Sequence, residues 1–180
     1  MSNSDECVAT TPPAVFVEGE REAQRRWGRA DRVTPERLAR LLLDHIPPEY
    51  HARIETLPYF FLATSNRSGE CDCSFKGGGP GLVRVLDART VAFPDYDGNH
   101  LFMSLGNILE NPHVGLLFID FSDGGRLRVN GRAEIHDDGP LFACFPDARR
   151  VVVVAVEQVT PNCAAHVPRL QPVTEKPTRG

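Results

Sequence analysis

Residues 74–84, SFKGGGPGLVR, combine a hydroxyl group, two cations and a run of glycines between two apolar segments. Glycines allow positive φ angles and a close approach of the backbone to a ligand, while exposed amides and Lys or Arg side chains neutralise phosphate. The residue types therefore predict an anion or phosphate cradle that uses Ser74, Lys76 and Arg84. The alternative is a flexible loop whose charges are solvated.

A second polar group lies in residues 98–121, GNHLFMSLGNILENPHVGLLFIDF, where Asn99, Ser104 and Asn107 follow a short helical pattern. These side chains could simply cap the helix or face water. A helix N-terminus beside the Lys76 loop would instead bring a partial positive charge and free donors to one anion. We therefore predict that the loop and the helix hold a single phosphate group together.

Other reactive side chains give weaker patterns. Cys71 and Cys73 stand two residues apart, so a strand would place both thiols on one face, as a metal or redox pair requires. We expect two small buried residues with a structural role instead, and predict no metal site. His100, His113 and His136 are candidate haem ligands, although no CxxCH motif accompanies them.

The elements that must position these residues follow from periodicity and from turn residues. Helices are expected over residues 18–29, from Pro35 to Ile46 with Thr34 as the cap, and within residues 47–57. Alternating β-branched and aromatic residues then predict six or seven strands, in segments 59–65, 71–78, 81–86, 90–95, 114–121, 125–136 and 149–159. Only one helix, before Pro112, interrupts them, which favours an antiparallel barrel with added helices over a doubly wound sheet.

Composition restricts the class of protein. A chain of 180 residues with 41% hydrophobic and 24% charged residues is typical of a globular domain, which we place at residues 16–170. Polar, Pro-rich ends predict a flexible arm over residues 1–15 and a flexible tail over residues 171–180. The net charge of -4 offers no general attraction for nucleic acid.

Compartment follows from three further features. No apolar run approaches the roughly 20 residues of a membrane span, and the first residues lack the regions of a signal peptide. Five cysteines without a CxxC pair argue against a secreted disulfide framework. A cytoplasmic protein is therefore expected.

The segments FLATSNRSGECDCSFKGG, VRVLDARTVAFPD, SLGNILENPHVGLLFID and GRLRVNGRAEI, in this order, resemble the pyridoxamine 5'-phosphate oxidase-like, FMN-binding split-barrel family. The resemblance, to a bacterial branch of that family, covers roughly residues 57–135 and depends on order and spacing, since no single motif is diagnostic. It implies a mainly β fold, a six-stranded antiparallel split barrel with added helices. It also implies a homodimer that holds FMN noncovalently between its subunits.

The same resemblance implies which residues contact the cofactor. The flavin phosphate is held at a strand end, which falls here on Ser74, Phe75 and Lys76. The strand edge near the isoalloxazine falls on Phe93, Pro94 and Asp95. The start of the inserted helix adds phosphate contacts from Asn99, Ser104 and Asn107. Well-studied oxidases carry an Arg-Lys pair at that helix, where this chain has Met103 and Ser104. The negative charge of the phosphate must then be compensated by Lys76, Arg84 and backbone donors. Arg126 stands where those enzymes place a Gln, and its cation could stabilise a reduced, anionic flavin. The implied cofactor residues are Ser74, Phe75, Lys76, Arg84, Phe93, Pro94, Asp95, Asn99, Ser104, Asn107 and Arg126.

The predicted function is that of a flavoprotein oxidoreductase that passes a hydride or electrons from a donor such as NAD(P)H to a small organic acceptor. The flavin would supply the chemistry, in agreement with the absence of Ser-His-Asp, HExxH and paired-carboxylate patterns. Vitamin B6 oxidation is disfavoured, because the carboxy-terminal Trp and Arg elements of true pyridoxamine phosphate oxidases are absent. The alternatives are a non-catalytic flavin or haem carrier, and a dimeric scaffold that has lost its cofactor.

Overall fold

Two units make up the chain, and the boundary between them falls between Arg40 and Leu41. The computed structural model describes residues 17–28, 34–162 and 164–171. The predicted arm and most of the predicted tail lie outside these residues. The first unit carries α1 (Glu18–Trp27), a charged helix that buries none of its residues, as its sequence predicts. Among the described helices, none has the length and apolar run needed to cross a membrane.

The helix α2 (Pro35–Leu41) begins as predicted but ends early. Thr34 Oγ1 accepts a hydrogen bond from the Arg37 amide at 3.3 Å, and proline occupies the first helical position. The predicted continuation to Ile46 is wrong. Ile46 precedes Pro47, whose ring excludes the helical conformation from Ile46, and the backbone of Leu43 pairs with Val159 in the last strand.

Among its described residues, the second unit is built on one antiparallel sheet with three helical elements. Its seven strands follow the order β2-β1-β5-β6-β7-β4-β3. The strands are β1 (Tyr59–Ser65), β2 (Cys71–Gly77), β3 (Arg84–Asp87), β4 (Thr90–Asp95), β5 (His113–Ile119), β6 (Arg126–His136) and β7 (Arg150–Asn162). The helical elements are α3 (Pro48–Thr56), α4 (Met103–Glu110) and the 3-10 helix η2 (Pro140–Cys144). The mainly β, antiparallel class is confirmed, with a short edge strand, β3, beyond the six strands of the resemblance.

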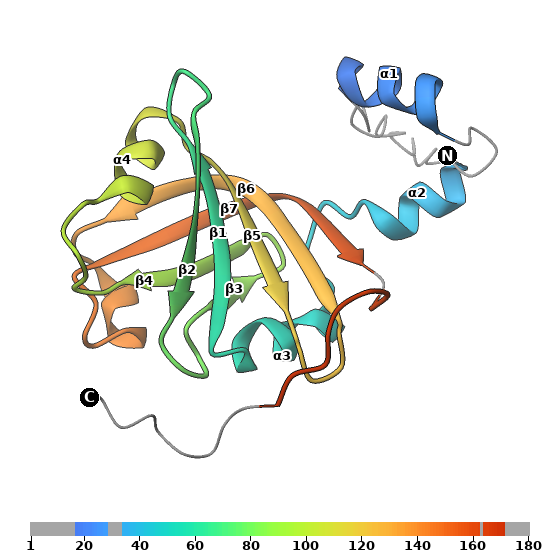
Figure 1. The fold of residues 1–180 in the computed structure, drawn as a ribbon. Coiled ribbons are helices and arrows are strands. Elements are labelled where there is room, and N and C mark those ends of the chain that lie inside the picture. The colour runs from blue at the N-terminus through green and yellow to red at the C-terminus, as the bar shows by residue number, and fades with distance from the viewer. Residues whose placement is uncertain (1–16, 29–33, 163, 172–180) are drawn as a thin grey trace, which may run out of the picture. The chain divides into compact units, whose positions relative to one another are not determined.

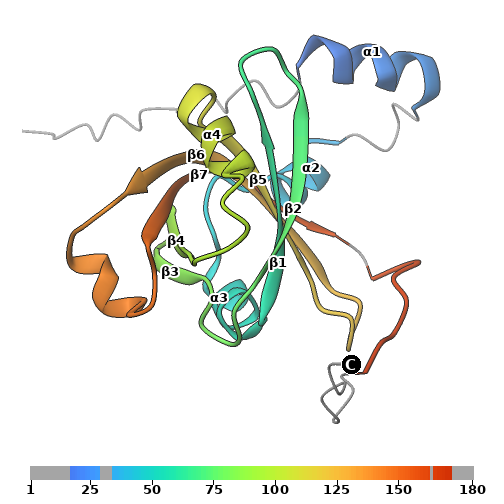
Figure 2. The same ribbon diagram turned by 60° about the vertical axis from the view of Figure 1, so that its left-hand side comes forward.

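The sheet curls around its main hydrophobic core, which contains Phe60 and Phe93. The ring centroids of Phe60 in β1 and Phe93 in β4 lie 5.0 Å apart, although three strands separate β1 from β4 in the sheet order. A flat sheet would hold these strands roughly 19 Å apart, at about 4.8 Å per strand. In Figure 1 the β3–β4 pair lies behind the β1–β2 hairpin, and the turned view in Figure 2 shows it beside that hairpin. In both views α3 and α4 lie at different ends of the curled sheet.

Strand β2 is an edge strand, and this position decides which of its side chains are exposed. Its register places Ser74 opposite the buried Leu62 and Lys76 opposite the buried Phe60, so one face of β2 continues the inner face of the sheet. Cys71 and Cys73 belong to the other face and are exposed. Our expectation that both thiols are buried is wrong, because alternation in the sequence reveals the two faces of a strand but not whether another layer covers them.

At the α3 end of the barrel, Arg53 is held against the turn that joins β5 to β6. Its guanidinium donates to both carboxylate oxygens of Asp123, at 3.0 and 2.7 Å, and lies 3.9 Å from the carboxylate of Asp120. Asp123 also accepts a hydrogen bond from the Gly125 amide at 2.6 Å. The hydrogen bonds from Arg53 hold the pKa of Asp123 well below its ordinary value. We refer to Arg53, Asp120 and Asp123 as the clamp.

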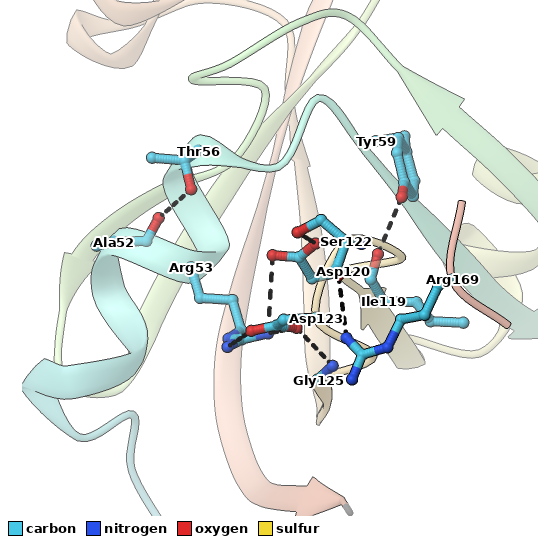
Figure 3. A network of polar contacts seen from close by, with 10 residues as sticks. All are labelled: Ala52, Arg53, Thr56, Tyr59, Ile119, Asp120, Ser122, Asp123, Gly125 and Arg169. Atoms are coloured by element: carbon cyan, nitrogen blue, oxygen red, sulfur yellow. Dashed lines mark hydrogen bonds and ion pairs between the residues drawn. The ribbon is translucent and has the colours of Figure 1, made fainter. Parts of the chain in front are cut away.

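The segment after β7 docks onto the same turn. Arg169 Nη1 donates to the carbonyl oxygen of Ser122 at 3.0 Å, and the Leu170 amide donates to the carbonyl oxygen of Phe121 at 3.0 Å. Figure 3 shows Arg53 and Arg169 reaching this turn from two segments that are distant in the sequence. The clamp end of the barrel therefore joins α3, the β5–β6 turn and residues 164–171.

Candidate functional site

A cleft of about 810 Å³ opens beside the edge strand β2. One wall is β2, the second is the segment from Asp95 to Leu105 that leads into α4, and the third is the start of β7 at Arg149 and Arg150. The volume lies within the range of roughly 300–1,000 Å³ that is typical of small-molecule sites.

The wall formed by β2 carries a row of three different polar groups. Asp72, Ser74 and Lys76 alternate along the strand and therefore share its inner face. Among the described residues no further strand pairs with this edge, and the three side chains line the cleft. Within the part of the chain that the structure describes, Lys76 forms no ion pair, and its ammonium group is available to an anion.

The wall before α4 has an unusual backbone. His100 and Phe102 have φ angles of 59° and 51°, in the left-handed region that residues other than glycine rarely adopt. Phe102 is the N-cap residue of α4, and its side chain forms no capping hydrogen bond with the first turn. Asn99 Oδ1 accepts from the Leu101 amide at 3.1 Å, which fixes the turn that precedes the helix. The positive end of the α4 dipole thus begins at the cleft.

Ser104 connects α4 to β2. Its side chain is buried, with 6% of the residue exposed, and its hydroxyl donates to Asp72 Oδ2 at 3.3 Å. The hydroxyl oxygen of Ser74 lies 3.0 Å from that of Ser104. A hydroxyl group carries one proton, so when Ser104 donates to Asp72 the proton of the second bond comes from Ser74. The order of donation is therefore Ser74 to Ser104 to Asp72.

The third wall is held by Arg150. Its guanidinium lies 3.1 Å from the carboxylate of Asp95 and 3.4 Å from that of Asp137, and it stands 5.3 Å from the centre of the Phe102 ring. The strand pairing explains the first contact, because Asp95 of β4 lies directly opposite Arg150 of β7. Arg150 thereby connects the sheet to the left-handed residue at the start of α4.

The rim of the cleft is apolar. Five large side chains line it and are exposed, among them Phe75 with 63% and Leu101 with 67% of their surface accessible. The five are Phe75, Tyr96, Leu101, Phe102 and Met103. The cleft thus offers an ammonium donor on β2, a hydrogen-bonded pair of hydroxyl groups between β2 and α4, and apolar surface around its mouth. A ligand with an anionic end and a flat apolar end matches both features.

Six of the eleven residues implied by the resemblance lie in this cleft: Ser74, Phe75, Lys76, Asp95, Asn99 and Ser104. The predicted meeting of the Lys76 segment with the inserted helix is visible in the Ser74–Ser104 contact.

The other five residues lie elsewhere in the single chain. Phe93 and Pro94 are buried in β4, and Arg84 is exposed on β3. Asn107 donates its side-chain amide to Thr64 Oγ1 at 3.0 Å. Arg126 lies on the outer face of β6, because its neighbour Leu127 is fully buried in the core. Arg126 is therefore on the opposite side of the sheet from the polar row of β2.

Two cleft residues that the sequence reasoning missed differ in how they could have been found. Asp72 stands two residues before Ser74 in the predicted strand 71–78, so strand alternation could have placed it on one face with Ser74 and Lys76. Arg150 had no such signal, because its position depends on the pairing of β4 with β7, which are 55 residues apart at the Asp95–Arg150 pair.

A curled antiparallel sheet with a ligand-sized cleft at its open edge places the chain among barrel proteins with a site at the rim. The chain belongs to the pyridoxamine 5'-phosphate oxidase family, because the family model for pyridoxamine 5'-phosphate oxidase matches residues 46–172. This membership confirms the family resemblance that the sequence carries.

Solved structures share the fold. A variant of HupZ from Group A Streptococcus superposes with a TM-score of 0.54 and 20% identity, over 65% of this chain and 99% of that chain. A candidate pyridoxamine 5'-phosphate oxidase from Lactobacillus delbrueckii gives a TM-score of 0.52 and 23% identity, over 65% of this chain and 94% of that chain. No curated protein sequence matches the chain.

Proposed function

We propose that the chain is a flavoprotein that binds FMN in the cleft beside β2 and acts as an oxidoreductase on a small organic molecule. The observation that carries this proposal is Lys76, whose ammonium group forms no ion pair among the described residues and lies in a cleft with an apolar rim, in a chain from this family. The ammonium group suits a phosphate ester, and the apolar rim suits a flat ring system.

The residues fit FMN unequally along the cleft. Lys76 supplies a cation that fits a phosphate group. Asp72 places a carboxylate beside Ser104, and a second anion there would be repelled. The phosphate therefore fits best toward the Lys76 end of the row, and the rest of the ligand extends toward the apolar rim.

Bound FMN would supply the transfer of a hydride or electrons between a reduced donor and an acceptor. The side chains of this chain would bind and orient it. Lys76 would anchor the phosphate, and Arg150 would keep the start of α4 in place through Phe102 and Asp95. The side chains at the rim would exclude water from one side of the ring.

A homodimer forms part of the same proposal. On the outer face of the sheet, Tyr59, Phe61 and Phe75 form an aromatic cluster with ring centroids 5.7 to 6.5 Å apart. A second copy covering this face would shield an exposed Phe75 from water. Arg126 lies on this outer face and would reach a flavin only across such an interface. The exposed free thiols of Cys71, Cys73 and Cys144 support a reducing compartment such as the cytoplasm.

The visible spectrum of the purified protein tests the proposal. Flavin absorbance that is released on denaturation and identified as FMN is the expected result, and apoprotein should bind added FMN. A protein that is colourless and binds no added FMN would rule out the enzyme and the flavin carrier alike. A Soret band in place of flavin absorbance would identify a haem carrier. Anaerobic mixing with NADH or NADPH then tests turnover, because bleaching by either donor is expected of a nicotinamide-driven enzyme.

A further inference from the structure

Asp72 occupies a position in the cleft that is electrostatically unfavourable for a phosphate ligand. Its carboxylate accepts the hydrogen bond of the buried Ser104 hydroxyl, at the first turn of α4. That turn has no side-chain cap, and the positive end of the helix dipole stabilises a negative charge nearby. The chain thus carries its own anion next to the helix start, where the sequence pattern predicted the phosphate of a ligand.

The order of donation in this cluster extends the effect of Asp72 to Ser74. Because Ser104 donates to Asp72, the Ser74 hydroxyl is turned toward Ser104. A phosphate that binds at either serine must take a hydrogen bond away from this chain and must approach a carboxylate of like charge. A neutral hydroxyl group of a ligand could instead donate to Asp72 without either cost.

We propose that Asp72 is a specificity-determining residue of the cleft, which lowers affinity for phosphate near Ser104 and accepts a hydroxyl group of the ligand there. This inference rests on the proposed function, in which the ligand is a flavin with a hydroxyl-bearing chain and a terminal phosphate. The phosphate is then directed toward Lys76, at the other end of the row on β2. Asp72 sets the preference of the cleft between phosphorylated and unphosphorylated forms of the same flavin.

The test compares two substitutions that remove one negative charge from the same cleft. Asp72→Asn keeps the shape of the side chain and an acceptor for Ser104. Asp97→Asn is the matched control, because Asp97 also lines the cleft but pairs with His100 and Arg149, at 3.6 and 3.8 Å. Dissociation constants of FMN and riboflavin are measured for the native protein and both variants by quenching of flavin fluorescence, at one pH and one ionic strength.

The expected result is a change in the ratio of the two affinities. Asp72→Asn should strengthen FMN binding about tenfold, because removal of the like charge also opens the start of α4 beside Ser104 to the phosphate, and should leave riboflavin equal or weaker. Asp97→Asn should change the ratio by less than about threefold, since exposed charges are screened. An unchanged ratio in Asp72→Asn, or an equal change in both variants, would overturn the inference while flavin binding itself stands.

A second measurement separates the inference from the proposed function. Thermal unfolding is followed in inorganic phosphate and in sodium chloride of equal ionic strength, without flavin. Asp72→Asn should be stabilised by phosphate more than the native protein and more than Asp97→Asn. If no flavin binds but this gain is present, the proposed function fails and the role of Asp72 remains. If the gain is absent, the role of Asp72 fails whether or not flavin binds.

Discussion

The clamp and the cleft are two polar networks of one barrel, built from similar residue types and differing in how far their charges are paired. In the clamp, Arg53 meets Asp123 through two hydrogen bonds, and Asp123 accepts a third from Gly125. In the cleft, among the described residues, Lys76 has no ion pair. The clamp satisfies its own charges, whereas the cleft leaves a cation for something else to satisfy.

The backbone differs between the two regions as well. In the turn that carries the clamp, the one positive φ angle among the described residues belongs to a glycine, Gly124, which adopts it without strain. At the cleft the corresponding angles belong to His100 and Phe102, where each costs free energy. Strain that the surrounding structure maintains is a mark of functional sites. The comparison supports a structural role for the clamp and the binding role that we propose for the cleft.

The substitution Phe60→Ala should have the largest effect, because both regions depend on the closure of the barrel. Phe60 is fully buried and contacts Phe93 across the core, so its loss leaves a cavity between β1 and β4. We expect a loss of about 3–5 kcal/mol in the free energy of unfolding. Urea unfolding followed by circular dichroism measures it. The control Leu109→Ala, at a side chain that is 79% exposed, should change stability by less than about 0.5 kcal/mol.

The substitution Lys76→Ala should weaken ligand binding in the cleft without affecting the stability that the clamp provides. Loss of a charged hydrogen bond to phosphate should raise the dissociation constant of FMN about 10- to 100-fold and leave that of riboflavin within about twofold. Stability should hardly change, since the side chain has no ion pair among the described residues. Arg84→Ala, at a cation on β3 outside the cleft, should have the smaller effect on FMN. Equal losses of FMN and riboflavin affinity would contradict a phosphate contact for Lys76.

The elements of the fold could be predicted from the sequence because they depend on local patterns. The strand Tyr59–Ser65 has the predicted bounds, and Pro112 ends the inserted helix where expected. Ile46 was assigned to a helix because its spacing from Leu42 is helical, but the proline that follows has the stronger effect on its backbone.

Only those features of the site that depend on a single strand or turn could be predicted from the sequence. The shared face of Ser74 and Lys76 follows from alternation, and their meeting with Ser104 was a hypothesis about two weak signals. The contact of Arg150 with Asp95 depends on which strands pair, and the exposure of Cys73 depends on β2 lying at an edge. Neither the order of the strands nor the edges of a sheet are encoded in local periodicity.

The substitution Arg53→Met tests the other region, because it keeps the apolar stem of the side chain and removes its charge. We expect the melting temperature to fall by about 2–4 °C at pH 7, since the pair is partly exposed. FMN affinity should not change. The hydrogen bonds from Arg53 lower the pKa of Asp123 in the folded state. Their contribution is therefore present above about pH 4 and is lost as the pH falls through the folded-state value.

The direction of this pH dependence can be measured by calorimetry. The difference in melting temperature between the native protein and Arg53→Met should persist from pH 7 to about pH 4 and shrink at lower pH. A difference that grows on acidification would show that the Asp123 carboxylate is not what Arg53 stabilises.

The substitution His100→Gly should have the smallest effect and the opposite sign. Glycine adopts a φ of 59° without the steric cost that histidine bears, although it also loses more backbone entropy on folding. We expect a rise in melting temperature of about 1–2 °C, and His100→Ala, which keeps the strain, should show none. FMN affinity should fall, because a relaxed loop holds the start of α4 less firmly. The clamp variant Arg53→Met should lose stability and keep its affinity for FMN, whereas the cleft variant His100→Gly should gain stability and lose affinity. If stability and FMN affinity both fall in His100→Gly, the strain has no connection with binding.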